Sequence, residues 1–407
     1  MSQMSVPVAN KAESPSAARI LVVSGFGLLF DSMDVGLLAF VLAALAKQWH
    51  LNPGIMGVLG SVGFIGMAVG SAVAGLFADR FGRKSVFMWT LLIYSIATGL
   101  TAFAAGVGMF IFLRVLVGFG LGGELPVATT YVLESSPERE RGRRVVYLET
   151  FWALGSLVAA ILSFFIIPSL GWRIVFLVGA LPALYILVLR SSLPETPKFK
   201  ALKQRKSMWV SFATLWKRGM ARASAVTWIL WFIMNFAYYG MFVWLPSVMA
   251  LKGYSLVHSI GYVLIMTIAQ VPGYLTAAWL VEKWGRKRTL VPAMFFTALS
   301  ALGFGYAHST LWLIVFGLLL NYFMLAAFAG TYIFTVEQFP TIARASGIGW
   351  AAGFGRIGGI VAPFAVGAMI AAHVSFPTIF ILFFVTVLIG FFVVLLFGRE
   401  TKGDVLN

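Results

Sequence analysis

The chain has no cysteine and only four histidines among its 407 residues. The absence of cysteine excludes disulfides, thiolate metal sites and cysteine nucleophiles. His50, His258, His308 and His373 all fall in predicted connections between helices or, for His258, at the very start of a span, and they show no metal-ligand spacing. No nucleophile, base and orienting group occur together either. We therefore expect neither a metal, nor another cofactor, nor an enzyme.

Charged residues are also scarce, at 11% of the chain, whereas apolar residues make up 60% and the mean hydropathy is +0.93. So few polar residues cannot coat a water-soluble protein of this size, so we expect a lipid bilayer to be its solvent. Twelve stretches reach the roughly 20–25 apolar residues that a membrane-spanning helix needs. The predicted spans are 19–46, 54–79, 85–105, 109–133, 145–167, 172–190, 223–250, 256–281, 289–307, 311–336, 343–371 and 376–397.

The net charge of +16 follows the predicted topology and does not indicate a nucleic-acid partner. Among 30 Lys and Arg residues, only Lys47, Arg173 and Lys252 fall in odd-numbered connections, and only Arg114 and Arg356 lie well inside spans. The remaining basic residues share one face, which is the positive-inside pattern. We therefore expect both termini in the cytoplasm.

Two charged signatures recur at one offset. Residues 79–84, Asp-Arg-Phe-Gly-Arg-Lys, return 203 positions later as Glu-Lys-Trp-Gly-Arg-Lys, and Glu134 and Arg141 return at the same offset as Glu337 and Arg344. A repeat of this length predicts two like-oriented halves, as in transporters built from parallel repeats. The predicted organisation is an N-terminal tail at 1–18, a six-helix bundle at 19–190, a basic linker at 191–222, a second six-helix bundle at 223–397 and a tail at 398–407.

Residues 75–84, which end the second predicted span, resemble the signature of the major facilitator superfamily, and this resemblance covers essentially the whole chain. It implies an all-α fold of twelve transmembrane helices in two six-helix repeats, acting as a monomer. Loop charges that pair in only one conformation would form a cytoplasmic gate and bias the carrier between its outward- and inward-facing states. The candidate gate residues are Gly75, Asp79, Arg80, Gly82, Arg83, Glu134, Arg141, Glu282, Arg286, Glu337 and Arg344.

Five ionisable residues within spans are candidates for a substrate or ion pathway, because charges in a membrane are costly. Asp31 and Asp34 are three residues apart and so share a helix face, where one of them is expected to hold a proton. Arg114 lies within reach of Asp34 if the first and fourth spans adjoin. Glu124 is a second candidate proton carrier or a packing group. We expect Asp31, Asp34, Arg114 and Glu124 to serve proton coupling, although neutralisation by Arg114 alone is an alternative for the two aspartates.

Arg356 falls near the middle of the eleventh span, and no acid of the second half lies at a comparable depth. A guanidinium keeps its charge, so it needs either a carboxylate of the first half or an anionic substrate, and both place it at the central cavity. Aromatic and amide residues at similar depths suit a planar ligand. The other candidate substrate-binding residues are Trp152, Asn235, Tyr238, Tyr239, Gln270 and Tyr322.

The first span resembles that of prokaryotic niacin (nicotinate) permeases in residues 29–36, Leu-Phe-Asp-Ser-Met-Asp-Val-Gly, and resembles aromatic acid/proton symporters more loosely. The resemblance implies uptake of a small aromatic monocarboxylate, coupled to protons, by rocker-switch alternating access. Three alternatives remain: a benzoate-type symporter, an efflux carrier for organic cations that uses Asp31 and Asp34, and a non-transporting relative of the synaptic vesicle glycoprotein 2 group. The expected partners are a small organic anion, protons and the bilayer, and the resemblance to prokaryotic permeases implies a bacterial inner membrane.

Overall fold

The computed structural model describes residues 17–81, 83–135, 141–182, 185, 208–217, 219–340 and 343–402. Regular structure within these ranges is entirely helical. Eleven of the twelve predicted spans each correspond to one described helix or to two helices in line. The sixth predicted span is described only in part, as α6. By length and composition, nine stretches of the described helices are apolar enough to cross a membrane.

The first half contains helices that match the first six predicted spans to within a few residues at most described ends. They are α1 (Ala17–Gln48), α2 (Pro53–Phe81), α3 (Arg83–Thr101), α4 (Val107–Ser135), α5 (Arg141–Leu170) and α6 (Trp172–Gly179). Helix α5 begins four residues before its predicted span, which matters for the site described below.

The second half follows a short helix in the predicted linker, α9 (Met208–Leu215). Its helices are α10 (Ala221–Phe242), α11 (Leu245–Leu251), α12 (Leu256–Ile268), α13 (Gln270–Lys283), α14 (Arg286–Tyr306), α15 (Thr310–Gln338), α16 (Arg344–Ala371) and α17 (Phe376–Phe397).

Two spans predicted as single helices are interrupted. The seventh is divided into α10 and α11, and the eighth into α12 and α13. Each first helix ends four residues before a proline, Pro246 or Pro272. Proline has no N–H to donate to the carbonyl four residues earlier, and its ring clashes with that carbonyl, so a helix breaks or bends there.

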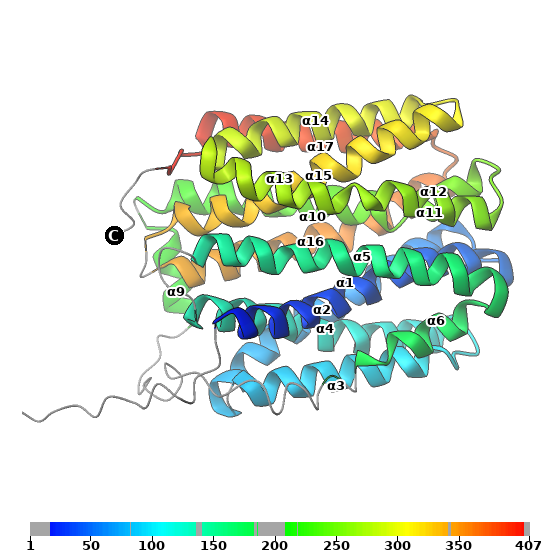
Figure 1. Ribbon diagram of the computed structural model, residues 1–407, viewed down its shortest axis with the longest axis horizontal. Helices are drawn as coiled ribbons and strands as arrows, with labels where there is room; N and C mark the ends of the chain where they lie inside the picture. Colours follow the sequence, from blue (N-terminus) through cyan, green and yellow to red (C-terminus); the bar gives the residue numbers. More distant parts are fainter. Residues whose placement is uncertain are drawn as a thin grey trace, which may run out of the picture.

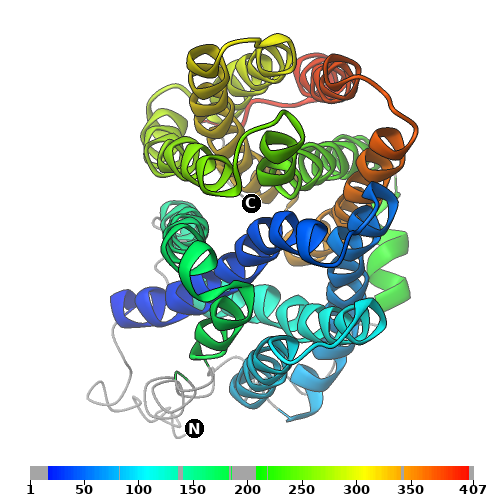
Figure 2. The same cartoon turned by 90° about the vertical axis from the view of Figure 1, so that its right-hand side faces the viewer.

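The helices run side by side along the long axis of the molecule (Figure 1). Helix α1 begins and helix α17 ends at one end, below called the basic end because Lys283, Arg286, Lys287 and Arg288 lie there. We call the other end the far end. Viewed along the helices, those of the first half (blue to blue-green) and those of the second half (green to red) form two groups that meet along one interface (Figure 2).

The interface is closed at the far end by α2 and α16, which pack together along the half boundary. A Cβ atom added at Gly367 of α16 would lie 2.6 Å from the Pro53 carbonyl oxygen and 2.9 Å from the Gly57 Cα atom of α2. Such a close approach of two backbones is possible only because glycines stand there. Helix α5 also packs against α12 and α13, and α1 against α11.

At the basic end of the second half, Glu400 organises several chain segments. Its carboxylate accepts hydrogen bonds from the backbone N–H groups of Arg286 at 2.9 Å and Arg288 at 3.1 Å, in the first turn of α14. It also accepts the N–H groups of Thr401 and Lys402. Burial disfavours the charged carboxylate, but these four donors outweigh burial and lower the pKa of Glu400 below its ordinary value.

The predicted gate residues of the second half are only partly joined. The Arg286 guanidinium forms an ion pair of 2.8 Å with Glu337, which also accepts a hydrogen bond of 2.6 Å from Thr401 Oγ1. Both contacts stay within the second half. Glu282 is exposed and Arg344 is partly buried. The description of the structure does not extend to the side chains of five gate candidates or to the surroundings of Gly75, and Gly82 lies outside the described residues entirely. The five are Asp79, Arg80, Arg83, Glu134 and Arg141.

Replacing Gly367 by valine should force the far end apart, because its Cβ position meets backbone atoms that cannot rotate away. The chain has no native cysteine, so spin labels at Asn52Cys and Ala372Cys report the separation of the halves directly. Electron paramagnetic resonance should show longer and broader distances in Gly367→Val than in the parent. Gly353→Val, on the same helix but facing open space, is the control. Unchanged distances would contradict this account of the closure.

Replacing Glu400 by glutamine should destabilise the protein by on the order of 1 kcal/mol, the usual value of a helix N-terminal cap. Folding lowers the pKa of Glu400. Its contribution to stability is therefore fully present above the ordinary glutamate pKa of about 4.3. This contribution is lost as the pH falls through the lower pKa of the folded state. The difference in melting temperature between wild type and Glu400→Gln should therefore persist from pH 8 to 5 and shrink below pH 4. The exposed Glu282→Gln is the control, and a difference independent of pH would contradict the assignment.

Candidate functional site

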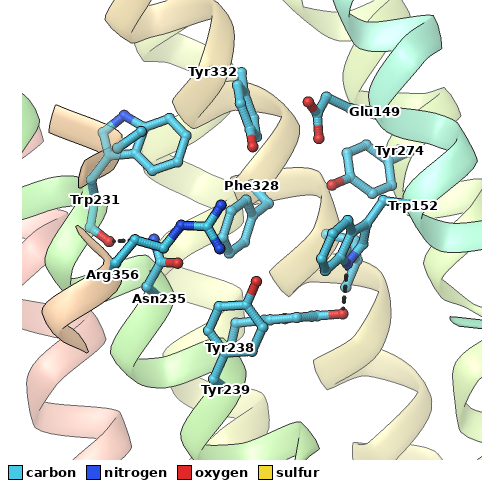
Figure 3. A pocket seen from close by; sticks show the side chains of 12 residues that line it. Glu149, Trp152, Trp231, Asn235, Tyr238, Tyr239, Tyr274, Phe328, Tyr332 and Arg356 are labelled. Atoms are coloured by element: carbon cyan, nitrogen blue, oxygen red, sulfur yellow. Dashed lines mark hydrogen bonds between the residues drawn. The ribbon is translucent and has the colours of Figure 1, made fainter. Parts of the chain in front are cut away.

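A cavity between the two halves gathers residues from five long helices. About 470 Å³ of space free of protein atoms lies among its lining residues, open solvent included. Its lining is largely aromatic, with one acid and one arginine. The lining residues are Glu149, Trp152, Trp231, Asn235, Tyr238, Tyr239, Tyr274, Leu325, Phe328, Tyr332, Ala352 and Arg356. We call it the central cavity (Figure 3).

Arg356 reaches into the central cavity from α16 (Figure 3). Its Nη1 atom lies 3.2 Å from the sulfur of Met67, which is a weak acceptor, and in the described part of the chain it forms no ion pair. Arg356 is only half-buried, and the Tyr238 and Tyr239 side chains lie near its guanidinium (Figure 3). The guanidinium is therefore positioned to receive an anion from the cavity.

Aromatic side chains from both halves surround this arginine. Trp152 of α5 donates a hydrogen bond of 3.0 Å from its Nε1 atom to the Tyr238 hydroxyl of α10, which joins the halves across the cavity. The rings of Tyr238 and Phe328 meet edge to face, with centroids 5.4 Å apart. Trp231 packs edge to face on Tyr332, with centroids 4.7 Å apart. These flat walls suit a planar ligand.

The sequence-predicted binding residues do not all reach this cavity. Trp152, Asn235, Tyr238 and Tyr239 line it together with Arg356. Gln270 lines a neighbouring cavity, which shares both tyrosines, and its amide nitrogen donates to Asn321 at 2.9 Å.

Tyr322 does not line the central cavity, the neighbouring cavity at Gln270 or the cavity at Asp34 and Arg114. Its ring instead packs against Phe323, with centroids 5.1 Å apart. A role of Tyr322 in binding stays a prediction, as do the binding roles of the residues that do line the cavities.

Glu149 was missed by the sequence argument, which considered only the five most deeply placed charges. It lies on α5, is 2% exposed and lines the central cavity. Its Oε1 atom makes no hydrogen bond, and the Tyr332 side chain lies beside the carboxylate. The available signal was an acidic residue inside the predicted fifth span, 145–167.

A second charged group lies in the first half, apart from the central cavity. Arg114 of α4 forms an ion pair of 3.0 Å with Asp34 of α1, and the Thr98 hydroxyl donates to the same carboxylate at 2.7 Å. Asp34 and Arg114 are each 1–2% exposed, and the guanidinium also lies over the Phe176 ring, 4.9 Å from its centroid. The pairing expected between the first and fourth spans is therefore present.

The other predicted proton-coupling residues are placed less fully. Asp31 is buried on α1, one helical turn from Asp34, but it does not line the central cavity. Glu124 has its side chain outside the described residues. Proton coupling by these residues therefore stays a prediction. Within the described ranges, no three His, Asp or Glu side chains gather as metal ligands do.

Comparisons with known proteins place the fold in context. A family model described as Major Facilitator Superfamily matches residues 25–270 and 257–406. A Bacillus subtilis protein named for niacin/nicotinamide transport, NiaP, is 50% identical, over 96% of this chain and 98% of its own length. The niacin transporter NiaP of Acinetobacter baylyi is 44% identical, over 95% of both chains. The inward-open xylose transporter XylE from E. coli superposes with a TM-score of 0.79 at 18% identity, over 96% of this chain and 98% of that one, which shows a shared fold.

Replacing Arg114 by leucine should destabilise the protein by about 3–5 kcal/mol, because Asp34 would remain buried without its cation. Removing both charges in Asp34→Asn/Arg114→Leu should restore part of this loss. Thermal unfolding of the purified variants in detergent measures both effects. If the two single changes add up in the double variant, the pair is not energetically coupled and the assignment is wrong.

Proposed function

This chain belongs to the major facilitator superfamily, and we propose that within it the protein is a secondary active transporter that takes up niacin as the nicotinate anion. The two NiaP relatives support this substrate, because they are similar over nearly the whole of this chain. Transport moves the ligand without changing its bonds, so the proposal requires neither a cofactor nor a catalytic group.

The observation that carries the proposal is the placement of Arg356. It is a guanidinium in the central cavity, and in the described part of the chain it forms no ion pair. A carboxylate matches the fork of a guanidinium and can accept two parallel hydrogen bonds from it. Nicotinate would supply this carboxylate, and Arg356 would hold it.

The aromatic walls would hold the pyridine ring. Trp152 comes from α5 of the first half, whereas Tyr238 and Phe328 come from the second half. A ring that packs against them from the cavity would contact both halves at once, so its binding energy depends on how the halves are positioned. This dependence is what a carrier needs, because a ligand shifts a conformational equilibrium only by its difference in affinity between the states.

Alternating access would then be a rocking of one half against the other. The far end is closed where Gly367 of α16 meets Pro53 and Gly57 of α2. We propose that substrate leaves the central cavity towards the basic end and that this end faces the cytoplasm. The gate residues named from the sequence remain the proposed contacts that close it.

Proton coupling is proposed for the first half. The buried Asp34–Arg114 pair lines a cavity that is separate from the one containing Arg356. Protonation of Asp34 would release Arg114 and change the packing of α1 against α4. Asp31, on the same helix, and Glu124 remain candidates for the same role.

The proposed location is the cytoplasmic membrane of a bacterium, with both termini in the cytoplasm, and the proposed functional unit is a monomer. The apolar helices and the transporter relatives support a multi-pass membrane protein. Orientation follows from the basic end, since basic connections are retained on the cytoplasmic side.

Replacing Arg356 by alanine should weaken nicotinate binding roughly 100-fold, which corresponds to the loss of a charged hydrogen bond of about 3 kcal/mol. Binding is measured as the rise in melting temperature of the purified protein with nicotinate, nicotinamide, benzoate or choline. Arg356→Lys, which keeps the charge but not the fork, should be intermediate.

The control for this measurement is Arg222→Ala, an exposed arginine whose Nε atom donates to the Phe397 carbonyl. It should leave nicotinate binding unchanged. Stabilisation by choline alone would instead support an organic-cation carrier. Nicotinate binding that survives in Arg356→Ala would show that the carboxylate is held elsewhere.

A further inference from the structure

We infer that Glu149 recognises the ring nitrogen of the substrate and thereby selects pyridine carboxylates over benzene carboxylates. The inference rests on the proposed function, because it assigns the second polar group of the same ligand. It concerns a residue of α5 in the first half, opposite the Arg356 side of the central cavity (Figure 3).

The first step is the position of the acid. Glu149 is the one acidic residue among those that line the central cavity, and Arg356 is the one basic residue. In Figure 3 they approach the cavity from different sides, on helices of different halves. The residue that matches Glu149 in the internal repeat is Ala352, which also lines the cavity. The cavity is therefore electrically asymmetric, with a carboxyl group on one side and a guanidinium on the other.

The second step is that Glu149 has bonding capacity left over. Its Oε1 atom is buried and makes no hydrogen bond, although the Tyr332 side chain lies beside the carboxylate. An unsatisfied polar atom inside a membrane protein is costly, and an ionisable residue there is by default a candidate functional site. A ligand atom that shares a proton with Oε1 would remove this cost.

The third step is that three nitrogen donors of the cavity are already engaged. Trp152 Nε1 donates to Tyr238, and Trp231 Nε1 donates to Thr335 at 2.9 Å. The amide nitrogen of Asn235 donates to the Trp231 carbonyl at 2.8 Å. Among the residues that line the central cavity, Glu149 alone has a fully buried side-chain oxygen or nitrogen without a hydrogen-bond partner.

Nicotinate has two polar groups at separate positions of one ring, a carboxylate and a ring nitrogen. If Arg356 holds the carboxylate, the ring extends between the aromatic walls and the nitrogen faces away from the arginine. A pyridine nitrogen and a carboxylate have comparable basicity, so one proton can be shared between them. Either the protonated Glu149 carboxyl group donates to the ring nitrogen, or the protonated ring nitrogen donates to the Glu149 carboxylate. The ligand would then bridge the first half, through Glu149, and the second half, through Arg356.

This arrangement predicts two independent selections. Nicotinamide retains the ring nitrogen but lacks the anion, so Arg356 discriminates against it. Benzoate retains the anion but lacks the nitrogen, so it leaves Glu149 unpaired. A site built to hydrogen-bond a ligand atom rejects an analogue that lacks this atom much more strongly than an apolar pocket rejects a small change in size.

The test is the ratio of the dissociation constants of benzoate and nicotinate in wild type, Glu149→Leu and Glu149→Gln. Wild type should prefer nicotinate by at least about tenfold, and Glu149→Leu should reduce the preference to within about threefold, mainly by weakening nicotinate. Glu149→Gln should retain most of the preference, because its amide N–H can donate to the ring nitrogen.

Three results would overturn the inference. They are an unchanged preference in Glu149→Leu, an equal loss of affinity for both acids in Glu149→Leu, or a preference that Glu149→Gln loses as fully as Glu149→Leu does. If a Glu149 variant keeps the wild-type ratio of dissociation constants but no longer accumulates substrate along a proton gradient, Glu149 is a coupling residue. That result would also contradict the inference. If Glu149→Leu does not fold, Glu149→Gln and the ligand series on wild type decide. Failure of the proposed function is distinct, since wild type would then bind neither acid.

Discussion

The constraint on which the structure depends is that the hydrocarbon offers no water to satisfy a buried polar group. Most polar side chains in the described helices therefore find partners inside the protein. The Asp34 carboxylate is held by Arg114 and Thr98, and the indole nitrogen of Trp231 donates to Thr335. Against this background the incompletely satisfied groups stand out, and two of them face the same cavity between the halves. The two halves are thus stabilised by internal pairing, and the ligand would complete the pairing between them.

Hydrophobic length predicted the fold because a bilayer imposes one dimension on every span, and most predicted ends agree with the helices to within a few residues. The interruptions of the seventh and eighth spans were missed, although Pro246 and Pro272 carried a signal for both. Length alone cannot reveal an interruption, because two short helices in line cross the membrane as well as one long helix does. Helix α9 was also missed, since a basic linker shows too few apolar residues for a span.

The sequence predicted those cavity residues whose position depends mainly on their depth in the membrane. Arg356, Trp152 and Tyr238 lie at similar depths along their spans and meet in one cavity. Tyr322 has a comparable depth but lines none of the described cavities, because the rotation of a helix about its axis is not encoded in depth. Glu149 was overlooked for a related reason. Helix α5 begins at Arg141, so this acid lies about two turns inside the helix and not near its start.

The contacts of Glu400 also have a consequence for the order in which the protein is completed. The first turn of α14 receives its cap from residue 400, more than one hundred positions later in the chain, and the Arg286–Glu337 pair is joined to the same tail through Thr401. During synthesis, α14 enters the membrane long before residues 400–402 leave the ribosome. The N-terminus of α14 therefore stays uncapped at the membrane surface during this time. The contacts of Glu400 and Thr401 form only after all helices of the second half have been inserted.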